Sequence, residues 1–461
     1  MKKIRRLLVA NRSEIAIRVL RAAAEMGIRT IAIFSNEDRF ALHRFKADES
    51  YRVGAGQKPI AAYLDIADII RIARENHVDA IHPGYGFLSE NADFAAAGAA
   101  AGIAFIGPKP EVMRLLGNKV SARQLAERAG VPVVPATEAL PLDLVGAKAL
   151  AAEVGYPLML KASWGGGGRG MRVIETEADL GPAMEVARRE ALAAFGNDEV
   201  YLEKLVRRAR HVEVQVMGDT HGQLVHLFER DCSVQRRNQK VVERAPAPYL
   251  SAERRAELCE AALRLARAAD YTHAGTVEFL LDADTDRFYF IEVNPRIQVE
   301  HTVTELVTGV DIVKAQIAIT EGARIGDEGS YVPRQADVHL YGHALQCRIT
   351  TEDPENGFPP DYGRINGYRS PAGFGIRLDG GTAYTGAVIT PYYDSLLVKV
   401  TAWGHQPEEA ARRMDRALRE FRVRGLASNL PFLENVINHP LFLSGECTTC
   451  FIDETPDLFV I

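Results

Sequence analysis

The sequence predicts a multidomain protein that combines α/β and α+β architecture. The chain has 461 residues, too many for one hydrophobic core, so two or three domains are expected. Up to about Pro108, apolar segments that end in Gly or Pro alternate with Ala-rich helical segments, whereas later strands pair as hairpins. We therefore expect an N-terminal doubly wound parallel α/β domain, a central α+β part and a C-terminal mixed α+β subdomain.

Composition and charge limit the classes of function. The chain is 47% hydrophobic and 25% charged, with a net charge of -6 and no block of like charge. Nucleic acid and acidic membrane surfaces are therefore not expected as partners. The apolar run before Asn11 is too short for a signal peptide, and no segment approaches the length of a membrane span. Five scattered cysteines favour a reducing compartment, which we take to be the cytoplasm.

The N-terminal domain is predicted from repeated strand-then-breaker signals. We expect strands at residues 4–10, 30–34, 78–84 and 103–108, and a helix at 12–26 that Gly27 ends.

Ligands bind beyond the carboxyl ends of strands in such sheets, so Asn11, residues 82–90 and Gly107 should face the main cleft. For His82, however, anchoring its own Gly-rich turn is the preferred interpretation. Cys447 and Cys450 form a single CxxC pair, for which zinc or redox chemistry is disfavoured because no second ligand pair accompanies it.

Two lysines precede candidate phosphate-binding features. Lys119 opens a helix that should run to about Ala129; a lysine there opposes the helix dipole, so it is better explained as a ligand for an anion. Lys161 ends a strand that enters the glycine run 165–170. That run matches G-x-G-x-x-G, but it leads into another strand and not into a helix, so a dinucleotide fingerprint is excluded. A glycine-rich β-hairpin whose amides close over phosphates is the better interpretation.

Two further segments are predicted next to this hairpin. Residues 200–205 should form a strand that returns to the main body, and its backbone could bind the edge of a nucleobase. Residues 229–240 follow an apolar strand at 224–228 and are unusually rich in long donors for an exposed loop. A plain solvated loop is the alternative.

The segment 291–301 carries the strongest functional signal. Apolar residues alternate with Glu292, Asn294, Arg296, Gln298 and Glu300, the period of a strand with one buried face. Pro295 removes a backbone donor, so the strand should break there and continue as a loop with reactive groups. A solvated edge strand shows the same alternation and remains an alternative.

A predicted hairpin brings carboxylates together. Residues 275–281 should pair with residues 288–294, which lets Glu278, Glu292 and Asn294 meet at one spot. Oxygen ligands without His or Cys favour Mg²⁺ or Mn²⁺ held together with substrate phosphates.

These motifs, taken together, resemble an ATP-grasp enzyme. The sequences at 11–16, 82–86, 230–237 and 294–301 are similar to those of biotin carboxylases, and the similarity runs essentially end to end. The resemblance implies a pre-ATP-grasp domain at 1–115, a linker helix region at 116–136, a mobile Gly-rich lid subdomain at 137–204, a central ATP-grasp part at 205–335 and a C-terminal subdomain at 336–461.

Within this family, residues 350–354, 360–365 and 451–456 resemble the biotin carboxylase domain of pyruvate carboxylases. A free-standing subunit of an acyl-CoA carboxylase, such as acetyl-CoA carboxylase, is the alternative. Asn238 departs from the His of many relatives, which affects how the ribose or phosphate would be held. Trp164 replaces a small residue and alters only the approach of the lid.

The resemblance implies a role for each candidate site residue. ATP would contact Lys119, Lys161, Gly167, Gly168, Glu203, Lys204, Leu205, His211, Gln235, Asn238 and Glu278. Mg²⁺ would be carried by Glu278, Glu292 and Asn294. Bicarbonate would be held by Lys240, Arg296, Gln298 and Val299, and biotin would face Arg348. The catalytic set would be Glu300, Arg296, Arg348 and Lys240, with Glu300 as general base.

The implied cofactors are ATP, Mg²⁺ or Mn²⁺, and biotin carried on a separate domain or subunit. Because the sequence has no Ala-Met-Lys-Met attachment motif, we expect a biotin carboxyl carrier and a carboxyltransferase, on a longer polypeptide or as separate subunits. A homodimer is also implied. Two alternatives remain: an ATP-grasp ligase that activates another carboxylate, and a nucleotide-binding regulatory module without chemistry.

Overall fold

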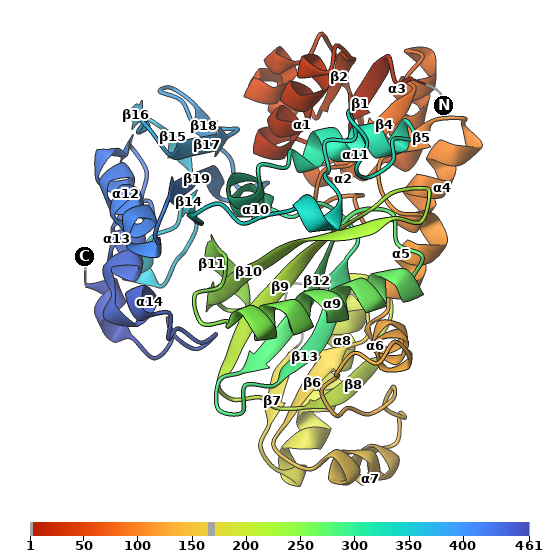
Figure 1. The fold of residues 1–461 in the computed structure, drawn as a ribbon, viewed down its shortest axis with the longest axis vertical. Coiled ribbons are helices and arrows are strands. Elements are labelled where there is room, and N and C mark those ends of the chain that lie inside the picture. The colour runs from red at the N-terminus through yellow and green to blue at the C-terminus, as the bar shows by residue number, and fades with distance from the viewer. Residues whose placement is uncertain (1–2, 165–170, 461) are drawn as a thin grey trace.

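The computed structural model describes residues 3–164 and 171–460, arranged around a central antiparallel sheet. Figure 1 shows the N-terminal α/β domain (red to orange) above this sheet, a small domain (yellow) below it and the C-terminal helices (blue) at its side. Among the described residues, no helix is both long and apolar enough to cross a membrane.

The N-terminal domain is the predicted doubly wound parallel sheet. Its strands, in spatial order, are β3 (Glu49–Arg52), β2 (Arg29–Phe34), β1 (Arg6–Val9), β4 (Ala80–His82) and β5 (Ala104–Phe105). Its helices are α1 (Ser13–Glu25), α2 (Pro59–Tyr63), α3 (Ile66–Glu75), α4 (Ala92–Ala100) and α5 (Pro110–Gly117). Strand β3 was not predicted, because its Glu-Ser-Tyr-Arg sequence has no apolar run and forms an edge strand.

The loops at the carboxyl ends of β1 and β4 hold each other in place. The Nδ2 of buried Asn11 donates to the backbone oxygens of Pro83 and Tyr85, both at 2.7 Å. The Nδ1 of His82 accepts a bond from the Gly84 amide at 3.0 Å, so its predicted role as an anchor of its own turn is confirmed.

The small domain contains β7 (Arg172–Ile174), β6 (Leu158–Ala162) and β8 (Val200–Lys204) in this spatial order, all antiparallel. Helices α7 (Leu144–Val154) and α8 (Glu177–Phe195) bury apolar side chains against it. The strands that flank the glycine run pair as predicted, but residues 165–170 themselves lie outside the described residues. Helix α6 (Lys119–Arg128) is capped by the Asn118 side chain, which accepts from the Ser121 amide at 2.9 Å.

The central sheet has eight strands, drawn from both the middle and the C-terminal part of the chain. In spatial order they are β13 (Phe288–Asn294), β12 (His273–Asp282), β9 (Ala209–Gly218), β10 (Leu224–Arg236), β11 (Gln239–Ala245), β14 (His343–Thr350), β19 (Leu396–Gly404) and β17 (Ile376–Gly380). Helices α9 (Ala252–Ala268), α10 (His301–Thr308) and α11 (Ile312–Thr320) pack around it. As predicted, β13 ends just before Pro295 and residues 295–300 form a loop.

The prediction of an exposed loop at 229–240 is wrong. Strand β10 continues to Arg236, and the polar residues from Glu229 to Ser233 are buried in the sheet. They can be buried because they are paired: the Arg230 guanidinium contacts Glu213 Oε1 at 2.6 Å, and Asp231 Oδ2 lies 2.9 Å from Arg244 Nε. Only Arg237 and Asn238 form the turn into β11, both with positive φ.

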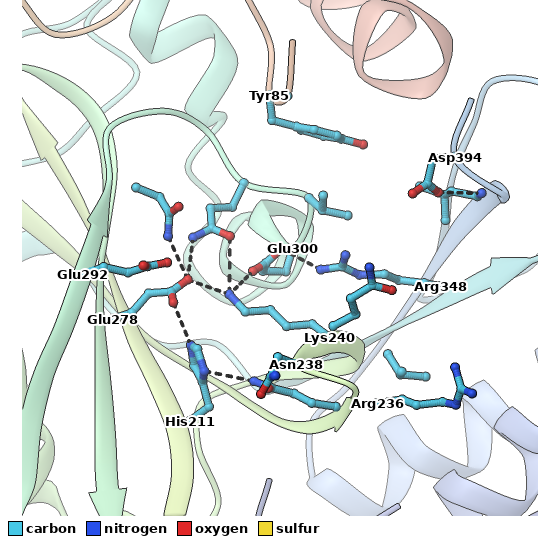
Figure 2. A pocket seen from close by; sticks show the side chains of 18 of the residues that line it. Tyr85, His211, Arg236, Asn238, Lys240, Glu278, Glu292, Glu300, Arg348 and Asp394 are labelled. Atoms are coloured by element: carbon cyan, nitrogen blue, oxygen red, sulfur yellow. Dashed lines mark hydrogen bonds and ion pairs between the residues drawn. The ribbon is translucent and has the colours of Figure 1, made fainter. Parts of the chain in front are cut away.

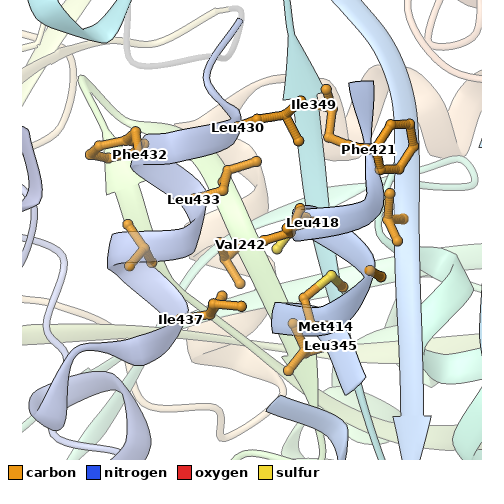
Figure 3. Close-up of a cluster of buried hydrophobic side chains, with 14 of the residues drawn as sticks. Val242, Leu345, Ile349, Met414, Leu418, Phe421, Leu430, Phe432, Leu433 and Ile437 are labelled. Atoms are coloured by element: carbon orange, nitrogen blue, oxygen red, sulfur yellow. The ribbon is translucent and has the colours of Figure 1, made fainter. Parts of the chain in front are cut away.

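The C-terminal part adds helices α12 (Pro407–Glu420), α13 (Leu430–Asn438) and α14 (Pro440–Ser444) and the short strands β15 (Gly363–Arg364), β16 (Gly367–Arg369), β18 (Val388–Ile389) and β20 (Arg422–Arg424). Short 3₁₀ helices lie at Glu37–Phe40, Leu42–Lys46, Gln335–Asp337, Pro354–Asn356 and Pro456–Phe459. Helices α12 and α13 cover one face of the sheet, where Met414, Leu418 and Leu433 pack against residues such as Val242 and Leu345 (Figure 3).

Candidate active site

One cavity of about 970 Å³ opens where the N-terminal domain, the small domain and the central sheet meet. Of the predicted site residues, the cavity is lined by Lys119, Lys161, Glu203, Lys204, Leu205, His211, Gln235, Asn238, Lys240, Glu278, Glu292, Asn294, Arg296, Gln298, Val299, Glu300 and Arg348. Gly167 and Gly168 lie outside the described residues. The residues predicted from the sequence therefore come from widely separated segments, which the fold brings to one place.

The carboxylates of the predicted metal site face each other across a hairpin. Glu278 on β12 and Glu292 on β13 are register partners, and the Nδ2 of Asn294 donates to Glu278 Oε1 at 2.8 Å. Lys119 Nζ lies 3.2 Å from Glu292 Oε2, so the helix-opening lysine reaches the same corner. Glu278, Glu292 and Asn294 offer carboxylate and amide oxygens as ligands. Such a set fits a hard divalent cation better than zinc.

Lys240 stands at the centre of the site. Its ammonium contacts Glu213 Oε2 at 2.5 Å, Glu300 Oε1 at 2.7 Å and Glu278 Oε1 at 2.8 Å. Figure 2 shows this lysine between Glu278 and Glu300. Burial disfavours its cation, but the three carboxylates outweigh that effect and hold the pKa of Lys240 well above its usual value. The cation thus persists at any physiological pH.

Glu300 is held between two cations. Its second oxygen, Oε2, lies 2.9 Å from Arg348 Nη2, and Arg348 Nε also donates to Glu243 Oε1 at 2.6 Å. The burial of Glu300 opposes ionisation, yet Lys240 and Arg348 keep its pKa below the ordinary value. Glu300 is therefore a carboxylate at neutral pH and able to accept a proton.

His211 contacts a carboxylate in this site. Burial alone would lower its pKa, but the carboxylate of Glu278, 3.2 Å from Nε2, is the main cause that raises it to about 9. The Gln235 amide nitrogen lies 2.9 Å from the other ring nitrogen, Nδ1. The His211 ring thus faces the cavity next to Glu278, one of the predicted metal ligands.

The lysines near the small domain play different parts. Lys161 pairs with Glu203, whose Oε1 also accepts a bond from the Tyr201 hydroxyl at 2.9 Å. The ammonium of Lys204, in contrast, donates to the carbonyls of Gly155 and Tyr156 at 2.8 and 2.9 Å. Two of the three ammonium hydrogens of Lys204 are therefore bonded to backbone carbonyls, which leaves one for a nucleotide.

Arg296 and Asn238 complete the predicted set. Arg296 Nε reaches Glu90 Oε1 of the N-terminal domain at 2.8 Å, which joins the 295–300 loop to the opposite wall. Asn238 has φ of +61° in the turn between β10 and β11. Asparagine tolerates this left-handed conformation better than most residues, which gives a local reason for its presence.

Two carboxylates of the site are not predicted by the sequence: Glu213 and Glu243 are fully buried partners of Lys240 and Arg348. Tyr85, in the 82–90 segment that was expected to face the cleft, overhangs the cavity (Figure 2). A signal for Glu213 exists, since polar residues alternate with valine along β9, as they do in β13. Apolar walls at Met159, Met171 and Ile291 gave no such signal.

Family models match successive parts of the chain. They are the biotin carboxylase N-terminal domain (residues 3–113), the ATP-binding domain of the carbamoyl-phosphate synthase L chain (118–327) and the biotin carboxylase C-terminal domain (346–454). An ATP-dependent ligase of the ATP-grasp class is the kind of enzyme that this fold and cavity define.

Individual relatives within this class are similar to the chain over nearly its whole length. The chain is 56% identical to pyruvate carboxylase of Bacillus subtilis and 54% identical to mitochondrial pyruvate carboxylase of Homo sapiens, in each case over 99% of the chain. It spans only about 40% of the length of these relatives, 40% and 38%.

A structure of Rhizobium etli pyruvate carboxylase with the allosteric activator acetyl coenzyme A superposes with a TM-score of 0.97 at 66% identity, over 100% of this chain and 41% of that chain. The biotin carboxylase domain dimer of Hydrogenobacter thermophilus 2-oxoglutarate carboxylase, in complex with MgADP, ADP and bicarbonate, superposes with 0.96 at 44% identity over 100% of both chains. The chain belongs to the biotin carboxylase family.

Proposed function

We propose that this chain uses ATP and bicarbonate to carboxylate biotin, as the biotin carboxylase domain of a pyruvate carboxylase. The single observation that carries the proposal is the position of Lys240. It contacts Glu278 of the candidate metal corner on one side and Glu300 on the other, and Glu300 in turn contacts Arg348. Glu278, Lys240, Glu300 and Arg348 thus form one continuous row of contacts. Along this row lie groups suited to a nucleotide, then to a small anion, then to an acceptor.

Nucleotide binding is assigned to one end of this row, where cationic and carboxylate groups lie near β12 and β13. Lys119 and Lys161 would neutralise phosphate charge and His211 would contact the phosphates, while the apolar walls would hold the base against the backbone of residues 203–205. The remaining nucleotide contacts are assigned to Gly167, Gly168, Gln235 and Asn238. Glu278, Glu292 and Asn294 would hold Mg²⁺ or Mn²⁺; when bound, such an ion supplies charge neutralisation at the transferring phosphate.

Bicarbonate would lie between Lys240, Arg296, Gln298 and the backbone of Val299. Glu300 accepts the bicarbonate proton while a bicarbonate oxygen attacks the γ-phosphorus, and the bond from that phosphorus to the ADP oxygen breaks. The products are carboxyphosphate and ADP. The ionised state of Glu300 supports its role as base, and the persistent cation of Lys240 supports charge stabilisation.

The acceptor end is assigned to Arg348. Carboxyphosphate loses its carbon–oxygen bond to give CO₂ and phosphate, and the phosphate takes the ureido N–H proton of biotin. The ureido nitrogen then bonds to CO₂, while the Arg348 guanidinium stabilises the negative charge on the ureido oxygen. Because Arg348 is only partly buried, it is accessible to an incoming acceptor.

The larger assembly is proposed from the relatives. Since the chain spans about 40% of the curated pyruvate carboxylases, we propose a biotin carboxyl carrier and a carboxyltransferase as its partners, with pyruvate as final acceptor. An acyl-CoA acceptor is the alternative. A homodimer is supported by the dimeric domain of the 2-oxoglutarate carboxylase relative. The division into 1–115, 116–136, 137–204, 205–335 and 336–461 is supported by the separate sheets of the first and third parts.

The first test is ADP release at fixed ATP and Mg²⁺, with bicarbonate and free biotin each present or omitted. We expect release that needs bicarbonate and rises with biotin. Release indifferent to both would favour another ATP-grasp ligase, and nucleotide binding with no ADP release would favour a regulatory module.

Two variants assign the steps. Arg348→Ala should lower biotin carboxylation by on the order of 10², the loss typical of one oxyanion donor, without weakening nucleotide binding. Glu300→Gln should strongly lower bicarbonate-dependent ADP release and change the pH profile of the residual release; an unchanged profile would remove Glu300 as base. Arg369→Ala, on the exposed end of β16, is the matched arginine control and should behave as wild type.

A further inference from the structure

A lysine outside the proposed set is buried directly behind the 295–300 loop. Lys399 lies on β19 and has 0% exposure. Its Nζ donates to the backbone oxygen of Val299 at 2.9 Å and lies 3.1 Å from Glu14 Oε2. One buried cation therefore touches a backbone group of the reactive loop and a carboxylate of the N-terminal domain.

The contact with Val299 constrains the base. The Val299 carbonyl belongs to the peptide unit that leads into Glu300, so a bond to this oxygen fixes the plane from which the Glu300 side chain starts. The far end of that side chain is held by Lys240 and Arg348. Glu300 is thus fixed at both ends, at the backbone by Lys399 and at the carboxylate by the two cations.

The contact with Glu14 constrains the opposite wall. Glu14 is 3% exposed in the first turn of α1, and its other oxygen, Oε1, accepts a bond from the Tyr85 hydroxyl. The Tyr85 ring lies above Arg348 and Glu300 in Figure 2. Lys399 Nζ itself lies 6.0 Å from the centre of that ring. Through Glu14, the same lysine therefore sets the position of an aromatic wall of the cavity.

A purely structural role does not explain the choice of residues. A buried ion pair is weak evidence for stability, because apolar residues of similar volume often do as well or better. An apolar residue could join the N-terminal domain to β19, but it could not bond to the Val299 carbonyl. Lys399 makes directional contacts with the Val299 carbonyl on one side of the acceptor end and with Glu14 on the other. These contacts indicate that Lys399 positions the groups around it.

We propose that Lys399 and Glu14 are positioning residues that hold the Val299–Glu300 peptide and the Tyr85 wall in one fixed arrangement at the acceptor end of the cavity. This inference rests on the proposed function. Neither residue touches a substrate in this proposal; each acts through Glu300 or Tyr85. ATP, at the other end of the cavity, should not sense the loss of either residue.

The test measures kcat, the KM for biotin and the KM for ATP, and asks whether a substitution changes the first two but not the third. Lys399→Met keeps the length of the side chain and removes both bonds. It should lower kcat for biotin carboxylation about 10- to 100-fold, since small displacements of reacting groups can cost up to about 10². It should also raise the KM for free biotin while leaving the KM for ATP within about twofold, and Lys399→Arg should restore part of the rate.

A second variant decides the question if Lys399→Met does not fold. Glu14→Gln keeps the shape of the side chain and removes only its charge, so it should raise the KM for biotin with an unchanged KM for ATP. The Lys399→Met and Glu14→Gln effects should be clearly less than additive, because both break one connected unit.

The outcomes distinguish this inference from the proposed function. If the wild-type chain shows no bicarbonate-dependent ADP release, the proposed function fails. If it does, and folded Lys399→Met or Glu14→Gln keeps wild-type kcat and KM for biotin, the positioning role alone is overturned. An equal loss of ATP and biotin binding would also overturn it, since that pattern indicates general destabilisation.

Discussion

The two faces of strand β14 are built on opposite principles. Arg348 and Gln346 point to a network of buried carboxylates that includes Glu243. Leu345 and Ile349, on the other face, pack under helices α12 and α13 (Figure 3). Stability on the apolar face depends only on side chains of the right volume and shape. On the charged face, each buried charge also depends on its ion-pair or hydrogen-bond partner. Substitutions on the first should therefore lower stability, and those on the second should lower stability and activity together.

The largest effect is expected in the carboxylate network that the charged face of β14 joins, at Lys240 on β11. Lys240→Met leaves three buried carboxylates without their shared cation. We expect a loss of about 3–5 kcal/mol in the free energy of unfolding, the range for one lost partner of a buried pair, and no measurable bicarbonate-dependent ADP release. Urea unfolding and the ADP assay check both.

The matched control for this substitution is Lys109→Met. Lys109 pairs with Asp270 at 2.7 Å, but both side chains are exposed, so the loss should stay below about 1 kcal/mol. If Lys240→Met and Lys109→Met are equally stable and active, the charged face does not depend on its central cation.

On the apolar face, Leu345→Ala should lower stability by about 2–5 kcal/mol through the cavity it leaves. Its kcat per folded molecule should stay at the wild-type value, measured at a temperature where the variant is fully folded. Leu345→Ile, which conserves volume, should cost less than about 1.5 kcal/mol. A large fall in kcat for folded Leu345→Ala would show that the two faces are not independent.

A pH titration extends the comparison to two buried histidines with opposite shifts. The pKa of His211 is raised to about 9 among carboxylates, whereas burial lowers that of His82 to about 4. Between about pH 4 and 6.5, His82 therefore takes up a proton on unfolding. Its contribution to the free energy of unfolding is intact above about pH 6.5 and is lost as the pH falls towards 4. His82→Gln should flatten the fall in unfolding free energy over this range, as measured by urea unfolding. An unchanged slope would mean that His82 is not neutral in the folded protein.

The smallest effect is expected at the turn that joins β10 to β11. Asn238→Ala places an ordinary residue at φ +61° and should cost about 1 kcal/mol, whereas Asn238→Gly should be nearly neutral. Thermal unfolding of both variants measures the difference. Equal losses would assign the role of Asn238 to its side chain and not to its backbone.

The sequence predicted the parts of the site that depend on local pattern. Alternation placed Glu292 and Asn294 on one face, and a short hairpin brought Glu278 beside them, as the register confirms. The 229–240 segment was predicted wrongly because charged residues are usually exposed, a rule that fails when each charge has a buried partner. Arg230, which is 0% exposed, shows this failure most clearly.

Contacts between distant segments could not be predicted in this way. The pair Lys399 and Val299 is 100 residues apart, and no pattern in either segment points to the other. Pairing of this kind depends on the whole sheet, which places β19 beside β14 and brings both next to the 295–300 loop.

That separation also has a consequence for synthesis on the ribosome. At about 5–20 residues per second, the chain needs on the order of 5–20 s to extend from Val299 to Lys399. During this time Glu14, Glu300 and the rest of the 295–300 loop have been synthesised, but the cation that joins them has not. The acceptor end therefore cannot assemble before β19 (Leu396–Gly404) has been made, and Glu14 and Glu300 have no contact with this cation until then.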